Sequence, residues 1–461
     1  MNRILLYLLG FSLFLCLAVS SCRRHSSGQE AVHRDLEQIK DSGELVVLTL
    51  YSSTSYFNYR GQEMGFQFEL SQQFAQSLGL RLRVEVAKTT HELIEKLLAG
   101  EGDLVAYPLP ITKEWRDSLT YCGEEVITHQ VIVQRTKGRN TLRDVTELIG
   151  KEVHVKPGKH YARLCNLNQE LGGGILIHRV DDENISAEDL ITQVAQGKIS
   201  YTVADNDIAR LNTTYYPNLD IQLSISFDQR ASWAVRRECT ELAAAADEWH
   251  RTNATSPAYT ASMKRYFEQS KRMPHTPILS LREGKISHFD DLFRKYASEI
   301  EWDWRLLASL AYTESNFDTT AVSWAGARGL MQLMPVTAHA MGVPEGKEQN
   351  PEESIRAAVR YIGQTSKRFA HIPAEERIHF VLASYNSGIG HVLDAMALAE
   401  KYGQNKHLWY GHVEKYILLK SNEEYFTDPV CRNGYFRGVE TYNFVRDIIQ
   451  RYELYKEKIK P

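Results

Sequence analysis

Apolar and polar residues alternate with two different periods along the first half of the chain. Short apolar runs, typical of buried strands, are separated by stretches in which apolar residues recur every three or four positions, as on one helix face. Strands that alternate with helices predict an α/β domain with two lobes. The predicted elements are strands at residues 45–50, 82–86, 103–106, 152–155, 175–177, 201–204 and 231–236, and helices at 66–78, 91–99, 160–171, 187–196 and 241–267.

The second half of the chain has a helical period almost to its end, and no strand-like run competes with it. Two prolines among basic residues at 271–277 predict a linker. The sequence therefore predicts a multidomain fold, with a two-lobed α/β domain at 43–268, a linker at 269–285 and a mainly α domain at 286–458. The helices expected in this last domain are residues 289–298, 304–314, 351–369, 375–385, 392–402 and 436–455.

The N-terminus has the pattern of an export signal. Arg3 precedes an apolar run at 4–19, a length that suits the hydrophobic region of a signal peptide. The run ends in Val19-Ser20-Ser21-Cys22, which resembles a bacterial lipobox. That resemblance implies a lipoprotein signal at 1–21, a lipid on Cys22, and a polar tether at 22–42 on the periplasmic side of a membrane, by expectation the outer one. The alternative is an ordinary signal peptide with a chance cysteine.

Composition excludes several classes of function. The formal net charge is −4, so the overall charge gives no indication of nucleic-acid binding. Cys122, Cys165, Cys239 and Cys431 are widely spaced and lack the pattern of a metal site, so we expect no metal and no organic cofactor. These cysteines are either buried thiols or include one disulfide.

One carboxylate stands out in the predicted helix at 304–314. Leu306, Leu307, Leu310, Ala311 and Glu314 share one helical face, so Glu314 would lie at the helix end on the buried side. Burial raises the pKa of a carboxyl, and a glutamic acid that keeps its proton near neutral pH can donate it to a leaving oxygen. The alternative is a solvated helix-terminal glutamate. We predict that Glu314 is catalytic.

Three ordered motifs follow: Glu314-Ser315-x-Phe317, then the segment 326–335 of sequence GARGLMQLMP, then the segment 383–388 of sequence ASYNSG. Together they resemble the lysozyme-like domain of soluble-type lytic transglycosylases. Residues 440–445 resemble the fourth motif of that family, with Phe444 at a position that is usually Tyr. The resemblance implies that Glu314 is the acid and the later base, and that the substrate-binding residues are Ser323, Gln332, Met334, Tyr385, Asn386 and Glu440.

Four of these residues also have a structural interpretation. Ser323 could be a turn serine, Met334 a core residue, Tyr385 a buried tyrosine and Glu440 a surface glutamate. Asp318 is the nearest other acid in the sequence, but four residues beyond Glu314 it is expected in a loop or cap. A single carboxyl suffices where the substrate supplies the nucleophile.

The two-lobed domain resembles amino-acid-type periplasmic solute-binding proteins. The residues that carry this are in segments 65–70, 97–104, 111–114 and 203–205. Such proteins usually place a carboxylate-binding Arg directly after Thr-x-Glu, but here Trp115 stands there and Arg116 follows. Trp115, Arg116 and Asp205 are therefore our candidates for a regulatory ligand, and the aromatic ring favours a peptide over a free amino acid.

The order of lipobox, solute-binding-like domain and transglycosylase-like domain resembles the membrane-bound lytic murein transglycosylase F family. This implies a lyase that cleaves peptidoglycan glycan strands between N-acetylmuramic acid and N-acetylglucosamine without water. Its other expected partners are muropeptides or stem peptides at the first domain and a membrane through the lipid. The alternatives are a hydrolytic lysozyme-type muramidase and a catalytically retired cell-wall sensing lipoprotein.

Overall fold

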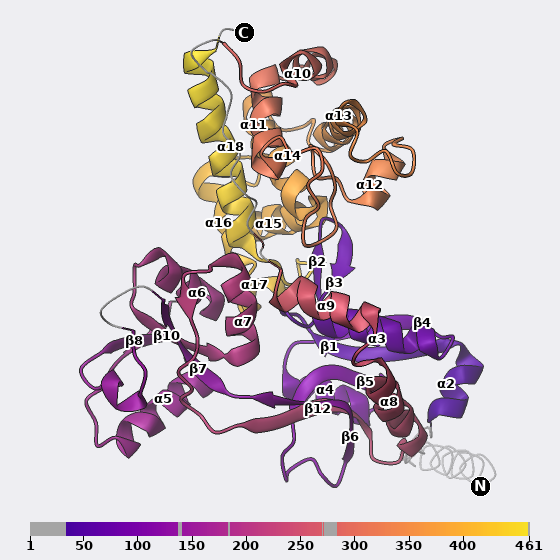
Figure 1. Ribbon diagram of the computed structural model, residues 1–461, viewed down its shortest axis with the longest axis vertical. Coiled ribbons are helices and arrows are strands. Elements are labelled where there is room, and N and C mark those ends of the chain that lie inside the picture. Colours follow the sequence, from indigo (N-terminus) through magenta and orange to yellow (C-terminus); the bar gives the residue numbers. More distant parts are fainter. Residues whose placement is uncertain (1–33, 137–140, 183–184, 270, 272–283, 460–461) are drawn as a thin grey trace, which may run out of the picture.

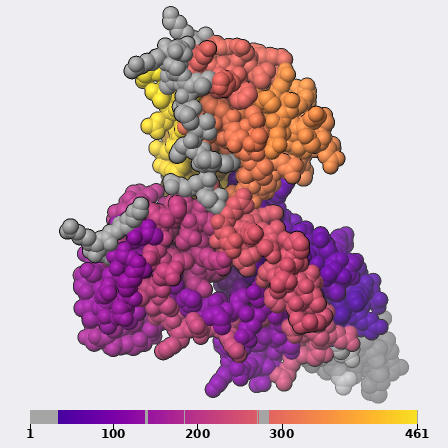
Figure 2. Space-filling model, in the orientation of Figure 1, coloured from indigo at the N-terminus to yellow at the C-terminus, as the bar shows by residue number. Residues whose placement is uncertain are grey.

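The structure is a computed structural model that describes residues 34–136, 141–182, 185–269, 271 and 284–459. The expected signal peptide, Cys22 and the first part of the expected tether lie outside these residues. Figure 1 shows two α/β lobes side by side with a helical domain seated over them, and Figure 2 shows this domain, orange to yellow, resting on both lobes. We call residues 34–128 and 229–269 lobe 1, residues 129–228 lobe 2, and residues 284–459 the helical domain.

Lobe 1 is built on a five-stranded sheet of order β4-β1-β5-β12-β6. The first three strands are parallel, whereas β12 is antiparallel to both of its neighbours. The apolar run of β1 is buried on both faces, as its sequence predicts. The elements of lobe 1 are α2 (Leu36–Ser42), β1 (Glu44–Leu50), α3 (Phe66–Ser77), β4 (Arg81–Ala87), α4 (Thr90–Leu98), β5 (Leu104–Pro110), β6 (Leu119–Thr128), β12 (Gln229–Arg236), α8 (Thr240–Asn253) and α9 (Pro257–Phe267).

Lobe 2 has a second five-stranded sheet, of order β11-β7-β10-β8-β9. The strands and helices expected in the two lobes are confirmed, except that the helix expected at 241–267 is two helices, α8 and α9, and that the sheets are mixed. Strands β6 and β7, which the sequence did not predict, carry the chain between the lobes and pair antiparallel with β12 and β10. The elements of lobe 2 are β7 (Gln130–Arg135), β8 (Glu152–Val155), α5 (Lys159–Glu170), β9 (Leu176–Arg179), α6 (Ala187–Gln196), β10 (Tyr201–Asp205), α7 (Asn206–Tyr215) and β11 (Leu219–Asp220).

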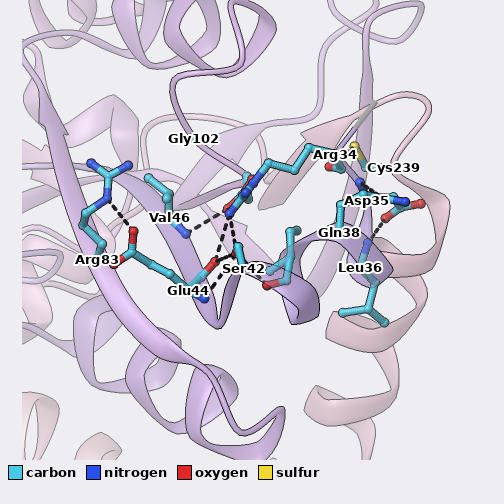
Figure 3. Close-up of polar contacts among 12 residues, drawn as sticks. Arg34, Asp35, Leu36, Gln38, Ser42, Glu44, Val46, Arg83, Gly102 and Cys239 are labelled. Atoms are coloured by element: carbon cyan, nitrogen blue, oxygen red, sulfur yellow. Dashed lines mark hydrogen bonds and ion pairs between the residues drawn. The ribbon is translucent and has the colours of Figure 1, made fainter. Parts of the chain in front are cut away.

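The expected tether at 22–42 is corrected at its C-terminal end, because its residues from 34 onward belong to lobe 1. Arg34 pairs with the buried Asp103 at 2.6 Å. It also donates to the Glu44 carbonyl at 3.0 Å, and Figure 3 shows Arg34 and Glu44 within this network of polar contacts. Asp35 caps α2 and also accepts the backbone N–H of Leu242 at 2.9 Å. These charge-assisted bonds make the first described residues a structural part of lobe 1.

The helical domain contains every helix expected from the sequence, and its core is formed by their apolar faces. Three short helices, α12, α16 and α17, were not predicted because they are too brief for a periodic signal. The helices are α10 (Asp290–Ala297), α11 (Trp304–Ser315), α12 (Pro335–Ala340), α13 (Pro351–Arg368), α14 (Ala374–Ser387), α15 (Ile389–Lys401), α16 (Glu414–Leu419), α17 (Glu423–Phe426) and α18 (Gly438–Lys458).

A small hairpin, formed by β2 (Phe57–Tyr59) and β3 (Gln62–Met64), projects from lobe 1 into the helical domain (Figure 1). Its two turn residues, Arg60 and Gly61, have φ angles of 50° and 75°, as a two-residue turn that matches strand twist requires. Glycine adopts this conformation without strain, but an arginine there is uncommon. The hairpin therefore presents Arg60 at its tip.

The four cysteines of the described structure, Cys122, Cys165, Cys239 and Cys431, are free thiols, which corresponds to the first of the two alternatives. Within the described residues, no helix is both long and apolar enough to cross a membrane.

Candidate active site

Glu314 lies in the last turn of α11, where the sequence predicts it. The side chain of Asp303 caps the start of this helix by accepting the N–H of Arg305 at 2.9 Å, and the helix ends at Asn316 in a left-handed conformation. Glu314 is only 6% exposed. Burial raises the pKa of Glu314 above its ordinary value, and the nearby guanidinium of Arg60 opposes this effect.

Arg60, from the hairpin of lobe 1, covers this carboxylate. Its Nη2 donates to both oxygens of Glu314 at 3.0 Å, and its Nη1 donates to the backbone carbonyl of Gln332 at 2.6 Å. The arginine side chain is 10% exposed, so the ion pair is shielded from water. The two partners are 254 residues apart in the sequence, and they bring the two domains into contact at the candidate catalytic group.

The backbone of the hairpin is held as closely as its side chain. The N–H of Arg60 donates to the Ser387 carbonyl at 3.2 Å, at the end of α14. Gly388, with φ of 91°, leaves room for this approach, because a Cβ there would lie 3.0 Å from the nitrogen of Gly61. The hairpin therefore fits against the motif at 383–388.

A buried charge network in the helical domain contacts another residue of the hairpin, Asn58. His391 Nε2 lies 2.9 Å from the carbonyl oxygen of Asn58, and its Nδ1 lies 3.1 Å from Nζ of Lys420, which also pairs with Asp394. An ammonium only donates, so Nδ1 accepts and Nε2 carries the proton that goes to Asn58. Burial and the Lys420 charge lower the pKa of His391 to about 3, which keeps the ring neutral in this arrangement.

The loop between α11 and α12 positions two of the predicted substrate-binding residues. Ser323 Oγ accepts the N–H of Ala327 at 2.9 Å, so in this state it stabilises the loop. The Gln332 side chain donates to the carbonyls of Ala321 and Gly329, and its own Oε1 is buried without a partner in the described structure. Gln332 has a φ of 47°, a strained conformation of the kind found at functional sites.

The remaining predicted residues come from α14, α18 and the loop before α12. The helix predicted at 375–385 extends to Ser387, so that Tyr385 and Asn386 both lie within the last turn of α14. Tyr385 donates to the Met331 carbonyl at 2.7 Å, and Asn386 accepts from Thr441 at 2.5 Å. Met334 is buried against lobe 1. Glu440, in α18, lies 3.1 Å from Arg437 and lines an internal cavity with Asn386.

The three ligand candidates of the two-lobed domain do not lie together. Asp205 lines a cavity of about 200 Å³ between the lobes. Hydrogen bonding to His160 and the charge of Lys159 outweigh the effect of burial and lower the pKa of Asp205 to about 2, so it is ionised. Trp115 packs near His91 beside α4, and Arg116 is exposed; neither lines this cavity.

Two residues that connect the domains, Arg60 and Glu188, were not predicted from the sequence. Arg60 had one local signal, a polar Arg-Gly pair between short alternating segments, but its partner lies in another domain. Glu188, in α6 of lobe 2, accepts hydrogen bonds from Ser53 in lobe 1 and from Tyr435 and Arg437 in the helical domain, at 2.9, 2.8 and 2.7 Å. Among the described residues there is no cluster of His, Cys, Asp and Glu that could hold a metal.

Both halves of the chain match known protein families. Residues 45–269 match the family described as bacterial extracellular solute-binding proteins, family 3, and residues 291–408 match the transglycosylase SLT domain. The chain is 32% identical over 429 residues to membrane-bound lytic murein transglycosylase F of Desulfosudis oleivorans, covering 92% of both chains. It is 30% identical to the protein of the same name from Aeromonas hydrophila subsp. hydrophila, covering 98% of this chain and 90% of that one.

Among solved structures, an ancestral cationic amino acid solute-binding protein matches half of the chain. The two are 19% identical, the TM-score is 0.44, and the match covers 50% of this chain and 99% of that one.

Glu314→Gln keeps the shape of the side chain but removes the proton it would donate. We expect turnover of purified peptidoglycan to fall by about 10²–10⁴-fold, because general acid catalysis contributes that much. Glu314→Gln is introduced into a chain that already carries Arg60→Ala, and its turnover is compared with that of Arg60→Ala alone. Arg60 contacts Glu314, so this removes any effect of the substitution on docking of the hairpin. Glu345→Gln, at an exposed glutamate of the same domain, is the control. Turnover within a few fold of the background would refute the assignment.

Proposed function

Because the chain belongs to the membrane-bound lytic murein transglycosylase F family, we propose how its buried glutamate cleaves peptidoglycan and how its first domain controls that reaction. Glu314 protonates the glycosidic oxygen between N-acetylmuramic acid and N-acetylglucosamine. The same residue then removes the proton from the muramyl 6-hydroxyl, which closes a 1,6-anhydro ring. The observation that supports this role is the burial of Glu314, which raises its pKa so that it can hold a proton.

The positions of the other acids support a reaction with one carboxylate. Glycosidases usually need a second carboxylate as nucleophile or base. Asp318 instead accepts the N–H and hydroxyl of Thr320, at 2.8 and 2.7 Å, within its own loop. Glu440 is engaged by Arg437. In this mechanism the acetamido group of the substrate stabilises the cation, as substrate-assisted enzymes allow.

The hairpin keeps the enzyme closed in this state. With Arg60 on both oxygens of Glu314, neither oxygen is free to approach a glycosidic bond. The charge of Arg60 also opposes the rise in pKa on which the mechanism depends. Activity therefore requires the hairpin, and with it lobe 1, to move away from the helical domain.

Glu188 connects this movement to the space between the lobes. Its carboxylate contacts three bodies at once: Ser53 of lobe 1, Asn212 of its own lobe, and Arg437 of the helical domain. Arg437 is itself buried, over the ring of Tyr215 at 4.0 Å. A change in the angle between the lobes would break these bonds, so lobe closure and domain contact are coupled through one carboxylate.

The ligand that drives the change binds in the cleft between the lobes. Ser55 Oγ, 1% exposed and without a hydrogen-bond partner in the described structure, lines the cavity with Asp205 and Asp207. A wider cavity of about 570 Å³ extends from Asp205 and Glu188 to α17 of the helical domain. No arginine lines either cavity in the described part of the chain, so a carboxylate clamp is missing. These features favour an amine-bearing wall peptide or muropeptide over a free amino acid.

A lipid on Cys22 would hold the enzyme at a membrane, by our proposal the outer one. The support for it is the lipobox at 19–22.

Arg60→Ala should open the active site. With Arg60 removed, docking would bury the Glu314 carboxylate without a counter-ion, and breaking a buried ion pair in this way costs about 3–5 kcal/mol. We expect turnover of peptidoglycan to rise at least tenfold, with 1,6-anhydro products identified by mass spectrometry. Arg60→Lys, which keeps a charge but cannot bind both oxygens in a planar fork, should give an intermediate rate.

The control is Arg81→Ala, which removes an exposed arginine of the same lobe that pairs with Glu44. Unchanged turnover in Arg60→Ala would contradict the closed-state proposal. Products one water heavier than anhydro ends would indicate a hydrolytic muramidase instead.

Muropeptides and stem peptides should bind to full-length Glu314→Gln protein in calorimetry and should stimulate the wild-type enzyme. The stimulation should disappear in Asp205→Asn, which loses a charge of the cleft, and in Arg60→Ala, which is already open. Tight binding of a free amino acid would refute the preference for peptides. Absence of binding by every compound would leave the first domain as a spacer.

Cys22→Ala should release the protein from the membrane fraction, because a buried acyl chain contributes about 0.8 kcal/mol per CH₂. Fractionation followed by immunoblotting measures this, with Cys165→Ala as the control. Membrane association that persists after signal cleavage would disprove the lipid anchor.

A further inference from the structure

Trp324 belongs to the helical domain but is covered by lobe 1. It is 9% exposed, and it packs in the apolar cluster of lobe 1 and not in the core of its own domain. Its ring centroid lies 5.4 Å from that of Tyr59 and 6.2 Å from that of Tyr266. The Lys271 ammonium lies 4.7 Å from the ring centroid. Tyr59 and Tyr266 belong to lobe 1, and Lys271 lies at the start of the predicted linker.

The indole is connected to Glu314 through two hairpin residues, Tyr59 and Arg60. The Tyr59 centroid is 5.4 Å from Trp324 on one side and 5.5 Å from the guanidinium carbon of Arg60 on the other. Arg60 in turn rests on Glu314. The tip of the hairpin thus puts a cation at the catalytic carboxyl and a flat six-membered ring at the neighbouring position.

The same indole lines the cavity that also contains Asn386 and Glu440, two of the expected substrate-binding residues. Asn58 and Tyr59 of the hairpin close this cavity from the other side. When the hairpin withdraws, the cavity becomes part of an open groove, and the face of Trp324 becomes its wall. Met334, which packs in the same cluster, is uncovered with it.

We propose that Trp324 is a saccharide-stacking residue of the glycan groove, one sugar position away from the bond that Glu314 cleaves. An uncovered indole exposes a large apolar face, and contact of that face with another apolar surface is favourable. The C–H face of a pyranose ring offers such a partner, and the amide and carboxylate of Asn386 and Glu440 can accept or donate hydrogen bonds at its edge. In the closed state, Tyr59 occupies the place of that sugar ring. This inference rests on the proposed function, because it needs a state in which the hairpin has left.

The test uses the full chain with Tyr59→Ala and Arg60→Ala, so that the tip can no longer cover the site. In this background Trp324→Ala should raise KM for glycan strands about two- to twelvefold, with kcat changed less than twofold, because aromatic stacking contributes roughly 0.5–1.5 kcal/mol. Trp324→Phe keeps a flat face and should restore most of the affinity. The same variants carrying Glu314→Gln should show a matching loss, and a matching recovery, of chitotetraose binding.

A purely structural role predicts a different pattern. Trp324→Ala and Trp324→Phe would then lower the melting temperature and kcat together, and KM would stay constant. Unchanged KM and unchanged chitotetraose binding in Trp324→Ala would also overturn the proposal. If the background chain forms no anhydro products, the proposed function fails, and chitotetraose binding still decides the role of Trp324.

Discussion

The buried ion pair between Arg60 and Glu314 is the interaction on which the closed structure depends. Each of these charges lies in a different domain, and both are shielded from water in this arrangement. A buried charge without a partner is strongly unfavourable, so each domain supplies the counter-ion that the other needs in this arrangement. The backbone bonds of the hairpin to Ser387 and His391 then serve mainly to hold Arg60 in register with the carboxylate. The property that makes Glu314 a good acid, its burial, is also what makes it a good receptor for an arginine.

The cavities of about 200 and 570 Å³ share Asp205 as a lining residue, and the wider one is also lined by residues of the helical domain. Helix α17 of the helical domain borders the cleft between the lobes, while the hairpin of lobe 1 borders the catalytic glutamate. Glu188 lies where all three bodies meet. A rotation of one lobe would therefore change the cleft and the catalytic groove together, without a separate chain of contacts between them.

The elements of the lobes and Glu314 itself could be predicted because their signals are local. The run Leu306, Leu307, Leu310 and Ala311 defines a helix face by spacing alone, and the structure buries that face. Arg60 could not be predicted, because its strands have three residues each and its burial comes from a partner 254 positions away. Trp115 was chosen from its place in a motif, but the fold turns that place away from the cleft. Trp324 was not singled out from the sequence, because no periodic pattern shows that a ring in a loop will be covered by another domain.

The inhibitory hairpin and the site it fills belong to one polypeptide, which fixes the strength of the closed state in a particular way. A tethered segment experiences a constant effective concentration, on the order of millimolar for short flexible connections. Dilution therefore does not release it, and the closed fraction is the same for one isolated molecule as for a crowded membrane surface. A free inhibitor would need a similar concentration throughout the compartment to give the same protection. In the proposed mechanism, control is thus a property of each molecule, and a molecule opens only where its own ligand is present.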